Sequence, residues 1–148
     1  MHDKFKLDRF LAAQADTYGS VVSELAAGHK RTHWMWFIFP QAAGLGHSPT
    51  SEFYAIRSSA EARAFLDHPV LGERLVECAN LLLATTGLAA LEIFGSPDDL
   101  KLRSSMTLFA SVAGPGNVFD KVLEKFYQGL HDAATMSILA SWSGETTA

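Results

Sequence analysis

The sequence predicts an all-α fold, a single compact domain of about eight helices over residues 1–148. Apolar residues recur at helical spacing along most of the chain, and glycine or proline separates one such stretch from the next. The nearest strand candidates, residues 34–39 and 91–94, are too few for a sheet of ordinary size. With 148 residues, 48% of them apolar, the chain can bury one substantial core.

The first helix is predicted over residues 7–27. Its apolar side chains recur every three or four positions, as they do on one face of a helix. Gly28 follows directly and suits the left-handed conformation that often ends a helix. Gly19 is a point at which this helix could divide into two.

The aromatic block of residues 34–39 is an unbroken apolar run, which fits a buried strand and a buried helix equally well. We favour a short buried helix, with Thr32 as its N-cap and Pro40 at its end. Six consecutive apolar side chains cannot all face water at tolerable cost. Trp36 and Phe37 are therefore expected in the core, and alanine at either position should cost roughly 3 to 5 kcal/mol of stability.

Capping residues and prolines locate the later helices. They are predicted over residues 49–56, capped by Ser48, over 60–66, capped by Ser58 or Ser59, and over 69–86, 89–94 and 97–113. Asn117 caps the next helix, and Asp132 caps a last one that ends at Trp142. The clearest start is Ser96-Pro97 followed by two aspartates, because it combines a serine cap, a proline at the first helical position and carboxylates at the positive end of the helix dipole. Ser96→Ala should cost about 1 kcal/mol. In the last helix, Met136 and Leu139 should face inward.

Composition disfavours several functional classes. The net charge is -4 and the Lys and Arg residues are scattered, so the chain lacks the basic footprint of a nucleic-acid binder. Cys78 is the only cysteine, which excludes an internal disulfide and fits a reducing cytoplasm. It lies on an apolar helix stripe and is expected in the core. No signal peptide opens the chain and no apolar run approaches the roughly 20 residues that span a bilayer, so we expect a soluble, cytoplasmic protein with no membrane partner.

Familiar catalytic and metal motifs are missing. Among the six histidines, His29 and His33 are four residues apart but lie beyond a predicted helix end, so no pair is held on one helix face and neither a metal nor a cofactor is expected. Ser48 lies beside His47 without a nucleophile-elbow motif, and a capping role for Ser48 accounts for it better. The loop at residues 44–46 is neither a phosphate-binding loop nor a dinucleotide fingerprint.

A candidate binding site combines polar residues at both ends of the aromatic block with polar residues of the 97–113 helix: Arg31, His33, Trp34, Gln41, Ser48, Lys101, Ser104 and Ser105. A tryptophan face can stack on a flat ligand, while Arg, Lys and hydroxyl groups bind phosphate or carboxylate. We expect Arg31 and Lys101 to form a positive pocket where the block meets residues 98–105. The alternative is structural: both tryptophans of the block lie in the core, Lys101 pairs with Asp98, and the serines lie at helix contacts.

Four long and unusual stretches carry a resemblance: KRTHWMWFIFPQ at residues 30–41, GLGHS at 44–48, HPVLG at 68–72 and DDLKLRSSMTLF at 98–109. In these stretches, and over nearly its whole length, the chain resembles a bacterial family of unknown function, some of whose members carry the label calpastatin. The resemblance implies a compact all-helical fold and supplies no reaction. The label implies an inhibitor of a calcium-dependent protease, but this chain does not look like the disordered, repetitive sequence expected of such an inhibitor.

Two functional hypotheses follow. The first is a protein that binds or acts on a phosphorylated or nucleotide-like compound, so that an anionic small molecule is the expected partner. The order of segments 101–109 and 119–126 is similar to that in all-helical glycosidases acting on ADP-ribose derivatives, but a matching catalytic acid is missing. The alternative is a protein-interaction module with no catalytic activity. Convergence of the candidate residues on one cavity would favour the first hypothesis.

Overall fold

The computed structural model describes residues 3–145, and within them the chain forms ten helices: α1 (Asp8–Gln14), α2 (Tyr18–Ala26), α3 (Met35–Ile38), α4 (Pro49–Phe53), α5 (Ser59–Asp67), α6 (Leu71–Ala84), α7 (Ala90–Phe94), α8 (Asp98–Ala110), α9 (Val118–Tyr127) and α10 (Ala133–Glu145). The described residues include no strand, and one isolated parallel bridge joins Ala42 to Ile56. The all-α prediction is confirmed, although the helices are more numerous than expected.

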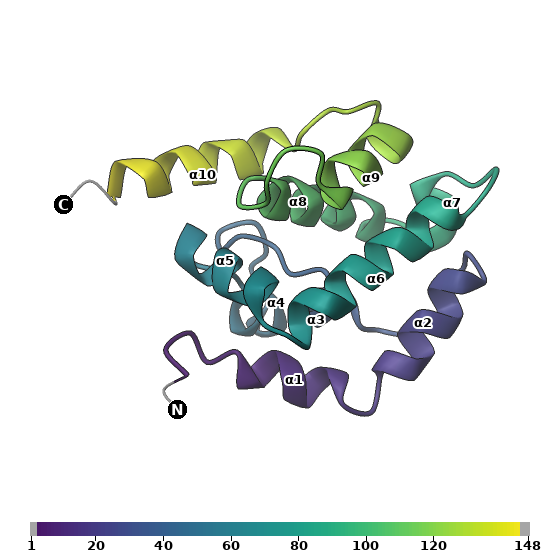
Figure 1. Cartoon of the computed structure of the whole chain (residues 1–148), viewed down its shortest axis with the longest axis horizontal. Coiled ribbons are helices and arrows are strands. Elements are labelled where there is room, and N and C mark those ends of the chain that lie inside the picture. Colours follow the sequence, from purple (N-terminus) through teal and green to yellow (C-terminus); the bar gives the residue numbers. More distant parts are fainter. Residues whose placement is uncertain (1–2, 146–148) are drawn as a thin grey trace.

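Helix α6 occupies the centre of the fold (Figure 1). It packs against α2, α5 and α9, while α8 packs against α7, α9 and α10. Figure 1 shows α1 and α2 along one side of the molecule and α8 to α10 along the other. Buried side chains from these helices form one continuous hydrophobic core. Cys78 lies in this core, as predicted, and burial raises the pKa of its thiol to about 12.

A row of aromatic rings joins helices that are far apart in the sequence. The rings of Phe10 and Phe65 meet edge-on, with their centroids 5.0 Å apart. Phe65 lies 5.3 Å from Phe109, which lies 5.9 Å from Phe119. Such pairs contribute about 0.5 to 1.5 kcal/mol each beyond the burial of their area. The row therefore ties α1, α5, α8 and α9 together.

The aromatic block contains the helix α3, which confirms the helical alternative. A helix of four residues is not stable alone, so tertiary contacts must hold it. Trp34, fully buried just before α3, packs against Phe39 and Phe94 with ring centroids 6.2 and 6.3 Å away. The Gln14 side-chain amide donates to the Phe37 carbonyl at 2.8 Å and so satisfies one of the carbonyls that a short helix leaves free.

Trp36 was expected in the core but is only partly buried, whereas Phe37 is 9% exposed and belongs to the core as predicted. The reason is helical geometry. Successive residues of a helix point about 100° apart, so four consecutive side chains cannot all face the same interior. In α3, the residue that turns toward the surface is Trp36.

Four predicted N-caps are present. Side chains accept hydrogen bonds from first-turn amides at distances of 2.8 to 3.1 Å, and the four capping residues are Ser48, Ser58, Asn117 and Asp132. Each such cap contributes about 1 kcal/mol to stability. Local sequence chemistry therefore locates the starts of α4, α5, α9 and α10.

Ser96 does not cap α8, so that prediction is wrong. The helix begins one residue later than expected, with Pro97 at the N-cap position. The amides of Asp99 and Lys101 donate to the carbonyls of Gly95 and Pro97, at 3.0 and 3.1 Å. Because the main chain already satisfies these donors, the exposed Ser96 hydroxyl has no capping role.

Two further expectations are corrected. The first predicted helix divides at residues 15–17, where the Thr17 amide donates to the Gln14 carbonyl at 3.1 Å, and Gly19 lies inside α2. This turn lets α1 pack on α3 while α2 packs on α6. Met136 does not face inward: α10 packs against α8, which leaves Met136 48% exposed, while Leu139 packs against the core.

Close packing requires two glycines of the stretches that carry the resemblance. A Cβ atom at Gly72 would lie 1.9 Å from the Leu66 carbonyl oxygen, so glycine allows the end of α5 to approach α6. A Cβ atom at Gly46 would lie 2.6 Å from the side chain of Ser51, so glycine allows the preceding loop to close against α4. Both glycines thus serve contacts within the chain.

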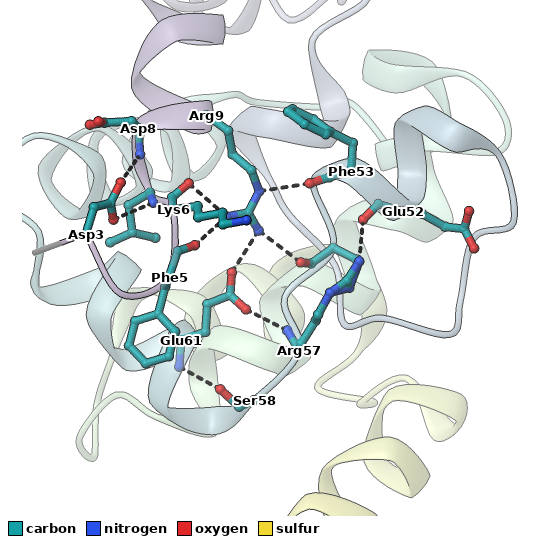
Figure 2. A network of polar contacts seen from close by, with 12 residues as sticks. Asp3, Phe5, Lys6, Asp8, Arg9, Glu52, Phe53, Arg57, Ser58 and Glu61 are labelled. Atoms are coloured by element: carbon teal, nitrogen blue, oxygen red, sulfur yellow. Dashed lines mark hydrogen bonds and ion pairs between the residues drawn. The ribbon is translucent and has the colours of Figure 1, made fainter.

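Arg9 of α1 joins three separate segments through its guanidinium group, as Figure 2 shows. The group donates to the carbonyls of Phe53 (2.8 Å), Phe5 (2.6 Å), Lys6 (2.9 Å) and Ala55 (3.1 Å), and to Oε2 of Glu61 (2.7 Å). All five N–H donors are therefore used. Glu61 is 5% exposed and also accepts from the Arg57 amide at 2.9 Å. This Arg9 clamp holds the N-terminal segment and residues 53–55 against α5.

Arg9→Lys should destabilise the protein by about 3 to 5 kcal/mol, because an ammonium group cannot reach five acceptors in different directions and leaves Glu61 poorly paired. Urea unfolding followed by circular dichroism measures the change. Arg31→Lys is the matched control, since the Arg31 side chain is exposed and makes no hydrogen bond or ion pair among the described residues, so the change should cost less than about 0.5 kcal/mol. Equal losses in the two variants would contradict a structural role of the clamp.

Candidate functional site

The loop from α3 to α4, together with α4, surrounds a cavity that we call the Trp36 hollow. Two hydrogen bonds close the base of the loop: the Ile56 amide donates to the Gln41 carbonyl at 2.9 Å, and the Ala43 amide donates to the Ile56 carbonyl at 2.8 Å. The hollow has a volume of about 150 Å³ and is lined by Trp36, Gln41, Ala42, Ala43, Gly44, Gly46, His47, Ser51, Glu52, Tyr54, Ala55 and Arg57. One continuous stretch therefore supplies every lining residue except Trp36.

The Trp36 hollow combines aromatic surface with several kinds of polar group. Trp36 and Tyr54 supply rings, the Gln41 amide can donate and accept, His47 supplies an imidazole and Arg57 a guanidinium group. A cavity of about 150 Å³ is large enough to receive a flat aromatic ring system. The hollow can therefore hold a flat ring between aromatic and hydrogen-bonding side chains.

Two lysines, each placed over one tryptophan ring of the aromatic block, share the carboxylate of Asp98 at the start of α8. Lys30 Nζ lies 2.9 Å from Asp98 Oδ2 and 5.1 Å from the Trp34 ring centroid. Lys101 Nζ lies 3.6 Å from Asp98 Oδ1 and 5.2 Å from the Trp36 ring centroid. The block and α8 adjoin, as the sequence predicts, and Lys101 brings a positive charge to the tryptophan that lines the hollow.

The carboxylate of Glu24, on α2, fixes the start of the aromatic block. It accepts from the amides of Arg31 (2.7 Å) and Thr32 (3.0 Å), from the Thr32 hydroxyl (2.7 Å) and from the Trp34 indole (2.9 Å). Thr32 is thus bound to Glu24 and does not cap α3, which corrects the sequence prediction. Burial opposes ionisation of the carboxyl group, but the hydrogen bonds outweigh it and lower the pKa of Glu24 to about 2.

The structure brings together only part of the predicted site. Gln41 lines the Trp36 hollow, and Lys101 lies against its tryptophan. Trp34 is 0% exposed and its indole N–H is bound to Glu24, so no ligand can reach it in this structure. Arg31 lines a different hollow, beside α2, and His33 is exposed. The cation that reaches α8 is therefore Lys30, the neighbour of Arg31.

The three predicted serines have structural surroundings. Ser48 caps α4. The Ser104 hydroxyl donates to the Leu100 carbonyl of its own helix at 3.3 Å. Ser105 is 0% exposed, and its hydroxyl has no hydrogen-bond partner among the described residues. These positions agree with the structural alternative for all three serines.

Sequence reasoning missed Glu52, Tyr54 and Arg57 as lining residues of the hollow. They lie on or just after α4, which the sequence presents as an ordinary capped helix. The available signal was the density of glycine and polar residues between Gln41 and Arg57, flanked by aromatic residues. Binding residues often lie on such loops, while regular elements hold the loops in place.

Three observations concern metal binding, membrane crossing and thiol reactivity in the part of the chain that the structure describes. Among residues 3–145, no three His, Cys, Asp or Glu side chains are grouped closely enough to hold a metal ion. None of the helices described there is long and apolar enough to cross a membrane. The thiol of Cys78 is buried and, with its raised pKa, stays protonated near neutral pH.

The sequence, including the four unusual stretches, matches a known family. A family model described as "Protein of unknown function (DUF1810)" matches residues 4–139. The chain belongs to the DUF1810 family. The match includes all four stretches that carry the resemblance, which is thereby confirmed, and the family description contains no calpastatin label.

The chain is also similar to a solved structure, the crystal structure of the conserved hypothetical protein Rv1873 from Mycobacterium tuberculosis. The sequences are 53% identical, the similarity covers 93% of this chain and 99% of that chain, and the TM-score is 0.92. The two proteins therefore share the all-helical fold. No curated protein matches the chain, and neither similarity supplies a reaction.

Glu24→Gln should destabilise the protein by about 1 to 3 kcal/mol at neutral pH, because a neutral amide replaces a carboxylate that accepts four hydrogen bonds. The fold lowers the pKa of Glu24 from 4.5 to about 2. Its contribution is therefore complete above pH 4.5 and is lost as the pH falls toward 2. The stability difference between wild type and variant, measured by urea unfolding from neutral pH downward, should shrink below pH 4.5.

The exposed Glu73 supplies the control for this experiment. Glu73→Gln should change stability by less than about 0.5 kcal/mol at neutral pH, as surface substitutions usually do. A Glu24→Gln effect that stays constant across the acidic range would contradict the role assigned to the ionised carboxylate.

Proposed function

We propose that the protein binds or acts on a phosphorylated or nucleotide-like small molecule, and that the Trp36 hollow receives a flat ring of this ligand. The observation that carries the proposal is the lining of one small cavity by two aromatic rings, an amide, an imidazole and a guanidinium group. Small-molecule sites in proteins are typically concave, with few convergent polar groups that fix orientation.

Gln41 is the predicted site residue best placed for recognition. Its main-chain carbonyl is already bound to the Ile56 amide, which anchors the residue at the base of the loop. Its side-chain amide can donate to one ring atom and accept from another. A residue with a fixed backbone loses little freedom when its side chain binds a ligand, which favours affinity.

Positive charge near the hollow favours an anionic ligand. Lys101 lies over the Trp36 ring, and Arg57 lines the cavity while using its Nη2 for the Glu52 carbonyl at 2.9 Å. Two carboxylates lie beside these cations, because Glu52 also lines the hollow and Asp98 pairs with both Lys101 and Lys30. Three cations therefore face two carboxylates at this place, on a chain whose net charge is -4. Charge-assisted hydrogen bonds from such groups to phosphate or carboxylate are among the strongest that proteins make.

The interaction-module hypothesis has weaker support. It requires an exposed apolar face, and the exposed large apolar side chains are Phe53, Val70, Leu91, Leu100, Leu130 and Met136. They come from different helices and loops along the described chain. Single exposed apolar residues are common on protein surfaces and do not by themselves indicate an interface.

A thermal-shift screen of nucleosides, nucleotides and sugar phosphates tests the proposal. A ligand at 100 times its Kd should stabilise the fold by about 2.7 kcal/mol, and for a domain of this size such a gain raises the Tm by roughly 5 to 10 °C. Gln41→Ala and Trp36→Leu should remove most of this shift, because they take away the amide and the stacking face of the hollow.

Arg31→Ala is the matched control, since Arg31 is exposed and lines a different hollow. It should keep the full shift. A ligand-induced shift that survives Gln41→Ala and Trp36→Leu but disappears in Arg31→Ala would move the site to the hollow beside α2 and refute the assignment to the Trp36 hollow.

A further inference from the structure

We propose that the phosphate groups of the ligand bind in a second hollow beside the first, so that the ligand is a nucleotide with its ring in one hollow and its phosphate chain in the other. The inference rests on the proposed function and names the substrate class of that site. The second hollow, which we call the basic hollow, is lined by Lys4, Phe5, Lys6, Arg9, Glu52, Phe53, Arg57, Ser58 and Glu61. Figure 2 shows most of these residues around the Arg9 clamp.

The two hollows adjoin because Glu52 and Arg57 line both of them. Glu52 lies on α4, and Arg57 follows the bridge residue Ile56, so the end of the loop separates one hollow from the other. The Trp36 hollow has a volume of about 150 Å³, and the basic hollow about 500 Å³. The smaller cavity suits a ring, and the wider one has room for a hydrated phosphate chain.

The basic hollow has an excess of positive charge, of which the fold uses only part: Arg57 Nη2 donates to the Glu52 carbonyl at 2.9 Å, and Lys4 Nζ lies 5.4 Å from the Phe5 ring centroid. Arg9 and Glu61 form an ion pair at 2.7 Å, and the remaining donors of Arg9 bind carbonyl groups, so this pair is already satisfied. What remains is the positive charge of Lys4, Lys6 and Arg57 against the single carboxylate of Glu52. Such a set of cations is complementary to a phosphate chain rather than to a neutral sugar.

The segment that carries the two lysines is held in place. The Lys6 carbonyl accepts from Nη1 of Arg9 at 2.9 Å, and the Asp3 carboxylate accepts from two amides at the start of α1, at 2.7 and 3.0 Å. These hydrogen bonds lower the pKa of Asp3, because they favour its ionised form. The lysines therefore start from a fixed backbone, which lowers the entropy cost of binding an anion.

Phe53 extends the aromatic surface that borders the two hollows. It is 58% exposed although it is a large aromatic residue, and it lines the basic hollow. Its ring meets that of Tyr54 edge-on at a centroid distance of 4.8 Å, and Tyr54 lines the Trp36 hollow. The two rings thus form a continuous aromatic edge from one hollow to the other, along which the sugar of a nucleotide can lie.

Isothermal titration calorimetry with adenosine, AMP, ADP and inorganic pyrophosphate tests the inference on the full chain. Wild type should bind ADP at least about tenfold more tightly than adenosine, a difference of ~1.4 kcal/mol. The double variant Lys4→Gln, Lys6→Gln should lose most of this difference and keep its affinity for adenosine. Lys121→Gln, an exposed lysine on α9, is the matched control and should bind all four probes as wild type does.

The outcomes separate this inference from the proposed function. Equal affinities for adenosine and ADP, or an ADP affinity unchanged in the double variant, would overturn the phosphate site and leave the ring site standing. Pyrophosphate bound as tightly as ADP, with adenosine unbound, would overturn the ring site and with it the two-part ligand. If none of the four probes binds, both proposals fail. Loss of ADP binding in Lys121→Gln as well would also overturn the inference, because it would show a general charge effect.

Discussion

The five hydrogen bonds of the Arg9 guanidinium group are the interaction on which the candidate site depends. They reach the N-terminal segment, the end of α4 and the buried carboxylate of Glu61 at once. A guanidinium group is planar and its donors point in fixed directions, so these segments can adopt few other arrangements. A buried ion pair alone is weak evidence for net stability. We infer that the clamp chiefly positions the wall that separates the two hollows.

The aromatic block has a buried part, which is bound by the Glu24 carboxylate, and an accessible part, which the Asp98 carboxylate approaches through Lys101. Glu24 binds the Trp34 indole and the backbone just before it, so this tryptophan belongs to the framework. Asp98 pairs with Lys101, which lies over the half-buried ring of Trp36. A single short helix therefore supplies both core packing and one wall of a cavity. The block has an unusual sequence because the same few residues pack in the core and line a cavity.

Much of the fold could be predicted from the sequence, because helix periodicity and capping are local. Ser48 and Asn117, for example, mark helix starts that the structure confirms. The prediction for Ser96 failed because the Gly95 carbonyl already accepts from the Asp99 amide that a Ser96 cap would serve, which residue types do not reveal. The site was harder to predict, because it depends on which basic side chain lies over which tryptophan ring: Lys30 over Trp34 and Lys101 over Trp36. From the sequence Arg31 and Lys30 are equivalent, and only the tertiary arrangement directs Lys30 toward α8.

The most direct test of the account is to follow the three tryptophan indole N–H signals by NMR while ADP is added, with each signal assigned from a Trp→Phe variant. If a ring enters the Trp36 hollow, the Trp36 signal should shift most, because its side chain lines the cavity. The Trp34 signal should barely move, since that indole is buried and bound to Glu24. A shift confined to Trp34 or Trp142, with Trp36 unchanged at saturation, would contradict the assignment of the site.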